Sequence, residues 1–347
     1  MKSLEKVFPG INAAVNRSHR SLRQFYARRS LKAWKRLLRY YYLRYVLRQP
    51  VPLIMDVSVT YRCQCHCVHC CAEAFRGSRA ADLTTEELKK LIDQAERLGV
   101  MQVVFSGGEP LLRKDIVELV RYAHDAGMMI RLNTNSLLLN PRIVLKLKKA
   151  GLDICAVSID DADPEVHDKL RGVPGLHKKA LSGIALLRKA GLFFNILTYA
   201  SKRNVTAGLE KTIAWARQHG VLSVLVYFPV AVGRWEAKFD QALDAEEREK
   251  VRELQDFRTV YMELPTANAL CYTYEKSIFY VSAYGDVTPC PVVPYTLGNI
   301  RDQSLEKIWR RWTDRLNLVW RGNCPMNDLR GREELKTYID SLPGAIS

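Results

Sequence analysis

The chain has 347 residues, of which 48% are hydrophobic, enough to form one large domain and a smaller one. No secretory signal is evident, and no apolar run approaches the roughly 18 residues of a membrane-spanning helix, so we expect a cytoplasmic protein. The net charge of +16 is concentrated at one end: residues 1–50 contain 13 Lys and Arg and a single acidic residue, Glu5.

Residues 1–50 read as a basic amphipathic arm. Apolar and aromatic side chains recur at steps of three and four residues, at Trp34, Leu37, Leu38, Tyr41 and Tyr45. Basic residues fall mostly on the other side, and prolines at 50 and 52 end the pattern, which predicts a helix. Its role stays open: packing on the main domain, contact of residues 20–48 with an anionic inner membrane face, or capture of an acidic partner.

Strand and helix patterns alternate from residue 53 to about residue 235. The predicted strands cover 55–60, 101–106, 129–135, 153–160, 193–199 and 222–229, and the helices 84–99, 115–127, 141–151, 175–191 and 205–220. This order predicts an α/β fold, a parallel sheet with right-handed crossovers that closes, at least in part, into a (β/α)6 barrel over residues 51–235. Functional groups should lie on the loops at the strand C-termini.

After residue 235 the alternation stops. A charged helix is predicted over 244–257, a hairpin over 278–289 with Gly285 and Asp286 at the turn, and a short helix over 304–312. These elements predict a small α+β domain over residues 236–335, followed by a tail over 336–347.

A cysteine-rich loop follows the first predicted strand. It holds Cys63, Cys65, Cys67, Cys70 and Cys71, and a thiol cluster this dense in a cytoplasmic chain favours metal or redox chemistry over disulfides. Cys63, Cys67 and Cys70 stand in C-x3-C-x2-C spacing, so they can bind three irons of a [4Fe–4S] cluster and leave the fourth open. Because Cys65 and Cys71 offer further thiolates, a zinc site is not excluded by spacing alone.

Together with three further motifs, this loop resembles the signature of the radical SAM superfamily. The motifs are FSGGEP at 105–110, NTNS at 133–136 and AVSIDDADPEVHDKLRG at 156–172, each at the end of a predicted strand. The resemblance covers about residues 53–325. It implies reductive cleavage of S-adenosylmethionine (SAM) at the cluster, giving a 5′-deoxyadenosyl radical that abstracts hydrogen from a substrate. It also implies SAM contacts from Ser106, Gly107, Gly108, Glu109, Asn135, Ser158, Asp160, Arg171 and Tyr199.

A second cluster is implied by the C-terminal part. The pattern Cys271-x13-Gly285-x4-Cys290 is similar to the opening of a SPASM or twitch domain, and Cys324 offers a third thiol. Asn327 stands where the twitch pattern would have a fourth cysteine. We therefore expect an auxiliary [4Fe–4S] cluster on three thiolates, its fourth iron open to substrate or capped by Asn327, Asp328 or a residue from elsewhere.

The substrate is not specified by these motifs. Relatives with such a domain commonly modify peptides or proteins, so a peptide is the first hypothesis; a lipid or other membrane-associated molecule, or a tetrapyrrole or cofactor precursor, is the alternative. An external donor such as flavodoxin or ferredoxin would supply electrons. A zinc module that binds nucleic acid through the basic arm would leave the motifs at 105–110 and 156–172 unexplained. No catalytic acid or base is assigned.

Overall fold

The computed structural model describes residues 31–77, 80–205, 207–236, 238–256, 258–263, 273, 275–314 and 324–342. Its strands form one sheet in the order β10-β9-β8-β1-β2-β3-β4-β5-β6-β7. Six of them are the predicted barrel strands: β1 (Ile54–Thr60), β2 (Gln102–Gly107), β3 (Met129–Thr134), β4 (Ile154–Ser158), β5 (Phe193–Tyr199) and β6 (Ser223–Tyr227). Each pairs in parallel with the next, which confirms the predicted partial barrel.

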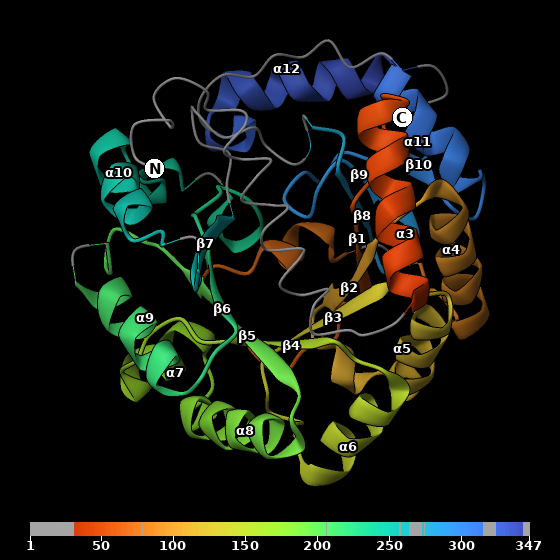
Figure 1. Ribbon diagram of the computed structural model, residues 1–347. Helices are drawn as coiled ribbons and strands as arrows, with labels where there is room; N and C mark the ends of the chain where they lie inside the picture. Colours follow the sequence, from red (N-terminus) through yellow and green to blue (C-terminus); the bar gives the residue numbers. More distant parts are fainter. Residues whose placement is uncertain are drawn as a thin grey trace.

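Helices form an outer ring around these strands (Figure 1). They are α4 (Thr85–Leu98), α5 (Ile116–Asp125), α6 (Pro141–Ala150), α7 (Pro164–Arg171), α8 (Leu176–Ala190) and α9 (Gly208–Gln218). The local signals act as expected: Thr84 and Glu87 form a capping box at the start of α4, and Gly99 ends it in the left-handed conformation. Only α7 was not foreseen; its Pro164 and N-cap Asp163 lie in a stretch that was interpreted as a motif alone.

Alternate strand residues face the helices and the lumen. The outward positions are apolar, as Met55, Val57 and Val59 of β1 show, and they join one core cluster with the helices. Several inward positions are polar, among them Asp56 and Ser58. Helix packing therefore stabilises the outside of the barrel, while its inside remains available for ligands.

The C-terminal part adds to the barrel rather than forming a separate sheet. β7 (Val260–Glu263) pairs in parallel with β6, and β8 (Ile278–Val281) pairs in parallel with β1. β8 and β9 (Asp286–Thr288) form the predicted antiparallel hairpin with Gly285 in its turn, and β10 (Gly298–Asn299) follows. Within the described residues, β7 and β8 are not paired, so the barrel stays open at that side.

Three helices accompany this part of the chain: α10 (Ala245–Glu253), α11 (Leu305–Asp314) and α12 (Leu329–Asp340). Five short 3-10 helices also occur: η2 (Cys71–Phe75), η3 (Pro110–Leu112), η4 (Gly233–Trp235), η5 (Phe239–Gln241) and η6 (Pro325–Asn327). A tail was expected over residues 336–347, but α12 continues into this range and ends at Asp340. Its Leu335 and Ile339 are buried, so packing holds residues that the sequence pattern left unassigned.

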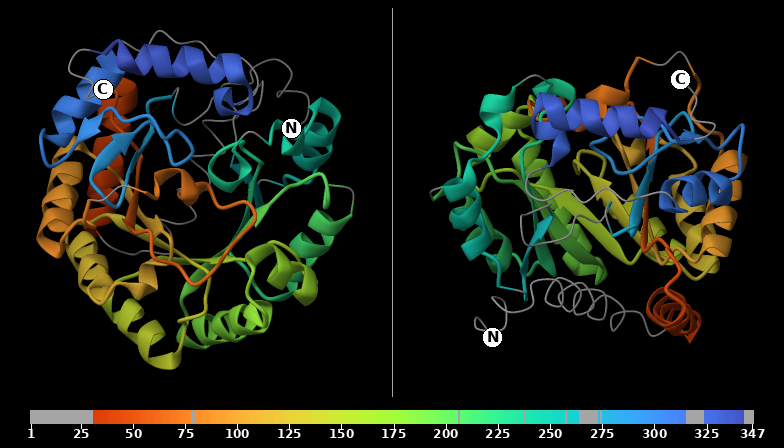
Figure 2. Two further views of the ribbon diagram at one scale, coloured as in Figure 1. Left: turned by 180° about the vertical axis from the view of Figure 1, so that it is seen from behind. Right: turned by 90° about the horizontal axis from the view of Figure 1, so that it is seen from above.

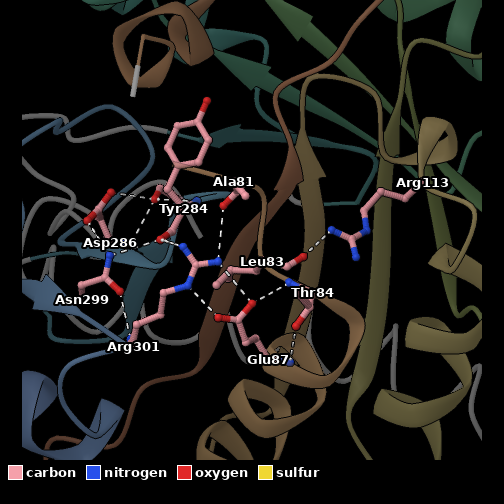
Figure 3. A network of polar contacts seen from close by, with 10 residues as sticks. Ala81, Leu83, Thr84, Glu87, Arg113, Tyr284, Asp286, Asn299 and Arg301 are labelled. Atoms are coloured by element: carbon pink, nitrogen blue, oxygen red, sulfur yellow. Dashed lines mark hydrogen bonds and ion pairs between the residues drawn. The ribbon is translucent and has the colours of Figure 1, made fainter. Parts of the chain in front are cut away.

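Arg301 joins the C-terminal strands to the start of α4 (Figure 3). Its guanidinium donates to both carboxylate oxygens of Glu87, at 2.6 and 3.2 Å, and to the carbonyl of Tyr284. Asn299 accepts from the Arg301 amide and donates to Asp286. The Arg301 charge, with the amide of the capping box, lowers the pKa of Glu87 to about 2. One carboxylate thus both caps a barrel helix and holds the hairpin against it.

The described part of the N-terminal arm, from residue 31 on, packs on the barrel, as one of the three hypotheses for the arm predicted. α3 (Leu31–Tyr41) continues into a π-type turn, η1 (Tyr42–Val46), and buries Leu37 and Tyr40 in a cluster with residues at the starts of the barrel strands. The Arg36 guanidinium donates to the carbonyls of Val100 and Glu96. Arg36, expected on a solvated face, is therefore part of the interface.

This arm lies at the opposite end of the barrel from the cysteine loop (Figure 2). Leu38 and Tyr45, expected on the packed side, are 67% and 56% exposed, because the buried stripe follows Leu37 and Tyr40 instead. Membrane contact of residues 20–48 stays a prediction, and 20–30 lie outside the described residues. No helix in the described part of the chain is long and apolar enough to cross a bilayer.

Candidate functional site

The cysteine loop closes over the C-terminal ends of the strands. It leaves β1 after Thr60 and runs into η2, and a pocket beneath it is lined by Cys63, Cys67 and Cys70 together with residues from β1 to β6. The amides of His66 and Val68 donate to the carbonyls of Arg171 and Leu170, so the end of α7 fixes the middle of the loop. The predicted ligand triad is thus assembled by contacts across the barrel mouth.

The triad fits an iron–sulfur cluster. A side-chain hydrogen bond from Cys65 lowers the pKa of Cys63 to about 6 and that of Cys67 to about 7. Asn135 Nδ2 lies 3.7 Å from the Cys63 sulfur and Arg171 Nη1 lies 3.6 Å from the Cys67 sulfur, each as a donor. These donors favour thiolates at Cys63 and Cys67, the form that binds iron, whereas burial raises the pKa of Cys70.

The thiols do not converge on one point. In the described part of the chain, no three His, Cys, Asp or Glu side chains are placed to hold a single metal ion. A cubane cluster binds each of its thiolates at a different iron, whereas a zinc ion takes all of its ligands at one point.

The other two cysteines of the loop differ from the triad. Cys65 lies between Cys63 and Cys67, and its amide donates to the Cys63 sulfur at 3.4 Å. Burial raises the pKa of Cys71 to about 12, with Tyr199 as a hydrogen-bond partner. Cys155 of β4 is fully buried among core residues, outside the cysteine loop.

Most of the predicted SAM contacts line this pocket. They are Ser106, Gly107, Gly108, Asn135, Ser158, Arg171 and Tyr199, which come from the ends of β2 to β5 and from α7. Glu109 and Asp160 are not in the lining. The contact of each residue with SAM stays a prediction, but the structure brings the lining set together around one cavity beside the cysteine triad.

Glu109 lies behind the pocket wall, fully buried. Its carboxylate accepts hydrogen bonds from Thr134 Oγ1, the Asn135 amide and the Leu111 amide, at 2.7 to 3.1 Å. Burial raises the pKa of Glu109 to about 7, although these hydrogen bonds act to lower it. Glu109 therefore ties the end of β2 to the end of β3 and positions Asn135.

The glycine pair has a packing role in addition to any contact with SAM. A Cβ on Gly107 would lie 2.2 Å from the Thr60 carbonyl oxygen, and one on Gly108 would lie 2.3 Å from that of Arg62. The amide of Gly108 donates to the Thr60 carbonyl. Only glycine lets the cysteine loop leave β1 so close to β2.

Arg171 is held by a buried ion pair. Its Nε and Nη2 donate to the two oxygens of Asp160 at 2.6 and 2.8 Å. His69 Nε2 lies 3.6 Å from the same carboxylate. Burial alone would raise the pKa of Asp160, but the charges of Arg171 and His69 lower it to about 2. Asp160 thus orients Arg171, whose Nη1 remains directed toward Cys67.

Two aromatic clusters stand beside the pocket, and the sequence analysis did not find them. His69, Tyr199 and Trp235 lie with ring centroids 4.4 to 6.3 Å apart, and Tyr199 also approaches Tyr227 at 5.8 Å. On the β1–β8 side, Phe75 lies 6.2 Å from Tyr61 and 5.0 Å from Tyr280. These residues come from separate elements, so no local pattern could reveal them.

A hydrogen-bonded tyrosine pair connects the second cluster to the lumen. The hydroxyls of Tyr61 and Tyr280 are 2.7 Å apart, and that of Tyr280 is 2.6 Å from Ser58 Oγ. Arg76 also lines the pocket, with Nη1 paired to Glu73 at 3.1 Å. The alternation of β1 and β8 could have identified Ser58 and Tyr280 as inward residues, had the parallel pairing of these strands been known.

The auxiliary site is described only in part, because Cys271 lies outside the described residues. Cys290 follows β9, and its neighbour Pro291 lines the pocket; Cys324 is buried at the start of η6. The Asn327 side chain accepts from the Ala231 amide and donates to the Pro229 carbonyl, and Asp328 caps α12. A role of Asn327 or Asp328 as an iron ligand stays a prediction. To bind iron, either side chain would have to break these hydrogen bonds.

Comparison with known proteins identifies the class. Residues 57–225 match the radical SAM superfamily, and residues 271–336 match the iron-sulfur cluster-binding domain SPASM. The chain belongs to the radical SAM superfamily and carries a C-terminal SPASM domain. It is therefore an enzyme that uses a [4Fe–4S] cluster and SAM, with an auxiliary iron–sulfur domain, and the fold and cofactors expected from the sequence are confirmed.

Among its relatives, the chain is 34% identical over 287 residues to the AdoMet-dependent heme synthase of Methanosarcina barkeri, covering 74% of this chain and 82% of that protein. It is 27% identical to the PqqA peptide cyclase of Granulibacter bethesdensis over 276 residues, 74% of each chain. Among solved structures, Streptococcus suis SuiB bound to its precursor peptide SuiA has a TM-score of 0.63 at 18% identity, over 77% of this chain and 66% of that one. The last likeness concerns the fold.

Proposed function

We propose that this enzyme modifies an iron tetrapyrrole that carries propionate groups, in the manner of a heme synthase. The sequence motifs put a peptide first, with a lipid or other membrane-associated molecule, or a tetrapyrrole or cofactor precursor, as the alternative. The order is reversed here because a heme synthase is the more similar relative over the greater share of its own length. The observation that carries the proposal is the combination of aromatic and cationic groups around one pocket.

The aromatic groups suit a flat conjugated ligand. Tyr199, Tyr227 and Tyr280 line the pocket, and Trp235 and Phe75 support them from behind. Rings at these positions offer faces and edges for stacking at distances that proteins use for aromatic pairs. A tetrapyrrole has the largest flat face among the substrate classes considered, so it gains most from such walls.

The cations suit the acid groups of that ligand. Arg76 and Arg171 line the pocket, and Arg234 donates to the carbonyl of Cys67 beside it. Glu73 pairs with both Arg76 and Arg234, and Asp160 pairs with Arg171, so the three guanidinium groups face two carboxylates and one positive charge is not offset. Guanidinium groups bind carboxylates strongly and with defined geometry, which favours a ligand with propionates.

The proposed chemistry is oxidative decarboxylation of a propionate to a vinyl group. SAM bound at the cluster would supply the radical that removes one hydrogen atom from the side chain. The bond to the carboxylate then breaks, carbon dioxide leaves, a C=C bond forms, and one electron passes to an iron–sulfur acceptor. Starting the cycle takes one electron from an external donor of the flavodoxin or ferredoxin type. The aromatic walls hold the ring in place, and burial of the pocket under the cysteine loop limits water.

A peptide substrate remains the second candidate, supported by the likeness to the PqqA peptide cyclase. The two differ in what must stimulate SAM cleavage. A peptide substrate would raise the release of 5′-deoxyadenosine without any change in a porphyrin, whereas the proposed reaction couples that release to carbon dioxide and a shifted porphyrin spectrum.

The test uses the reconstituted full chain under anaerobic conditions with SAM, a chemical reductant and iron coproporphyrin, which carries four propionates. We expect substrate-dependent release of 5′-deoxyadenosine and a product with vinyl groups, detected by absorption and mass. The variant in which Cys63, Cys67 and Cys70 are all alanine is the matched control and should give neither. Cleavage of SAM that is unaffected by the porphyrin, with no vinyl product, would reject the proposal.

A further inference from the structure

Parallel barrels usually fill the lumen with branched apolar side chains. Here an apolar group of Ala156, Leu197, Leu225 and Tyr261 fills only part of it, and other inward positions are polar. Asn133, Asn195 and Ser223 face inward at one level of β3, β5 and β6. Asn195 and Ser223 are buried and Asn133 is half-buried, and the Asn133 Oδ1, both amide atoms of Asn195 and the Ser223 hydroxyl have no hydrogen-bond partner. Unpartnered buried polar groups are rare in native proteins, so this layer calls for a polar ligand.

Arg131 lies one layer deeper on β3, two residues or roughly 6.6 Å below Asn133. Its side chain faces the lumen, because Ile130 and Leu132 on either side join the outer core. It is 5% exposed, and its Nε and Nη1 make no hydrogen bond. A cation this deeply buried normally has an anionic partner, since its desolvation costs several kcal/mol.

Asp56 does not serve as that partner. Asp56 on β1 and Arg131 on β3 both pair in register with Val104 of β2, which lies between them. The two charges interact, but the Asp56 carboxylate accepts its hydrogen bond from Ser106. Burial outweighs both neighbours and raises the pKa of Asp56 to about 6, which shows how incomplete the compensation is. Asp56, Asn133 and Ser106 line the pocket, whereas Arg131, Asn195 and Ser223 lie beyond its lining, so a ligand group that reaches them has to pass the floor of the pocket.

We infer that Arg131 binds a carboxylate of the substrate inside the lumen, with the amide of Asn195 and the hydroxyl of Ser223 as further donors. The inference rests on the proposed function and deepens it: one propionate enters the lumen while the ring stays at the mouth. A carboxylate fits better than a phosphate dianion, because Asp56 nearby would repel the additional charge. Arg131 then selects which acid side chain is held below the SAM site.

The experiment is an equilibrium titration of the reconstituted full chain with SAM and without reductant, so that no turnover is needed. The probes are iron coproporphyrin and its tetra-amide, which has the same ring without carboxylates, followed by absorption. We expect the wild-type protein to prefer the acid at least tenfold, and Arg131→Met to lose about tenfold of that preference. Arg188→Met, which removes an exposed arginine on α8, should leave the preference unchanged.

The outcomes separate the two claims. If the wild-type protein binds neither porphyrin, the proposed function fails and the inference with it. If the wild type prefers the acid and Arg131→Met prefers it equally, the function stands, the lumen holds only water, and the inference is overturned. If Arg131→Met has less iron or a weaker helical signal in circular dichroism than the wild type, Arg131→Lys is titrated instead, because lysine retains the charge. We expect this variant to keep part of the preference for the acid.

Discussion

Removing the charge of Asp160 tests how the site orients Arg171. In Asp160→Asn, the guanidinium keeps one acceptor but loses its charge partner inside the protein. The folded-state pKa of about 2 lies below the ordinary value of 3.8, so ionised Asp160 stabilises the fold above pH 3.8, and this contribution is lost as the pH falls through 2. The difference corresponds to about 2 kcal/mol at neutral pH.

Breaking a buried pair from one side typically costs more, about 3–5 kcal/mol, because the remaining charge is left uncompensated. The pKa figure counts only the difference between ionised and neutral Asp160, so it is the lower bound. We expect Asp160→Asn to lower the melting temperature by about 4–10 °C, taking about 2 °C per kcal/mol for a chain of this size. Glu334→Gln, which breaks the exposed pair with Arg330, should lower it by less than about 1 °C.

The double variant Asp160→Asn with Arg171→Met separates the charge from the packing. Because it removes both charges, it should recover most of the lost stability, while a pair of independent losses would add. The assay is an anaerobic thermal scan at a fixed rate, with the EPR response of the cluster to SAM as a second readout. We expect the response to be weakened in every variant that lacks or misorients Arg171. A double variant less stable than Asp160→Asn would refute the reasoning.

Three further predictions concern neighbouring groups. Asn135→Ala removes a hydrogen-bond donor to the Cys63 sulfur and should lower the reduction potential of the SAM cluster. If the bond favours the reduced cluster by about 1 kcal/mol, an EPR-monitored titration should show a shift of about 40 mV, and an unchanged potential would contradict the prediction. The pKa of Asp56 is raised from 3.8 to about 6, so the free energy of unfolding should fall as the pH rises through this window. Asp56→Asn should abolish this pH dependence in urea titrations and stabilise the protein by up to about 3 kcal/mol at pH 7. Gly108→Ala should prevent cluster assembly, judged by iron content, because its Cβ meets backbone at 2.3 Å, whereas Gly77→Ala has open space and carries only a left-handed strain of about 1–2 kcal/mol.

Local sequence signals predicted most of the barrel because each acts over a few residues. The capping box at Thr84, the proline that starts α6, and the glycines at 99 and 151 fix where helices begin and end. Apolar residues at alternate positions of the strands face the helices and form the core. β7 and β8 were missed as barrel strands, since they are four residues each and pair with β6 and β1 from distant parts of the chain.

The site divides in the same way. The cysteine spacing and the motifs at the strand ends could be read directly, and the parallel sheet then brings them to one edge. Glu109 and Asp160 were correctly singled out, but sequence could not show that they lie behind the pocket and position Asn135 and Arg171.

By itself the sequence determined the order of elements, the three thiols of the SAM cluster and the superfamily, because these depend on spacing along the chain. Only the tertiary structure decided that α3 packs against the far end of the barrel, that aromatic side chains from separate segments stand beside the pocket, and that two nitrogens of Arg131 have no hydrogen-bond partner in the lumen. Each of these depends on which distant residues share a face, and burial, unlike spacing, is a property of the whole fold.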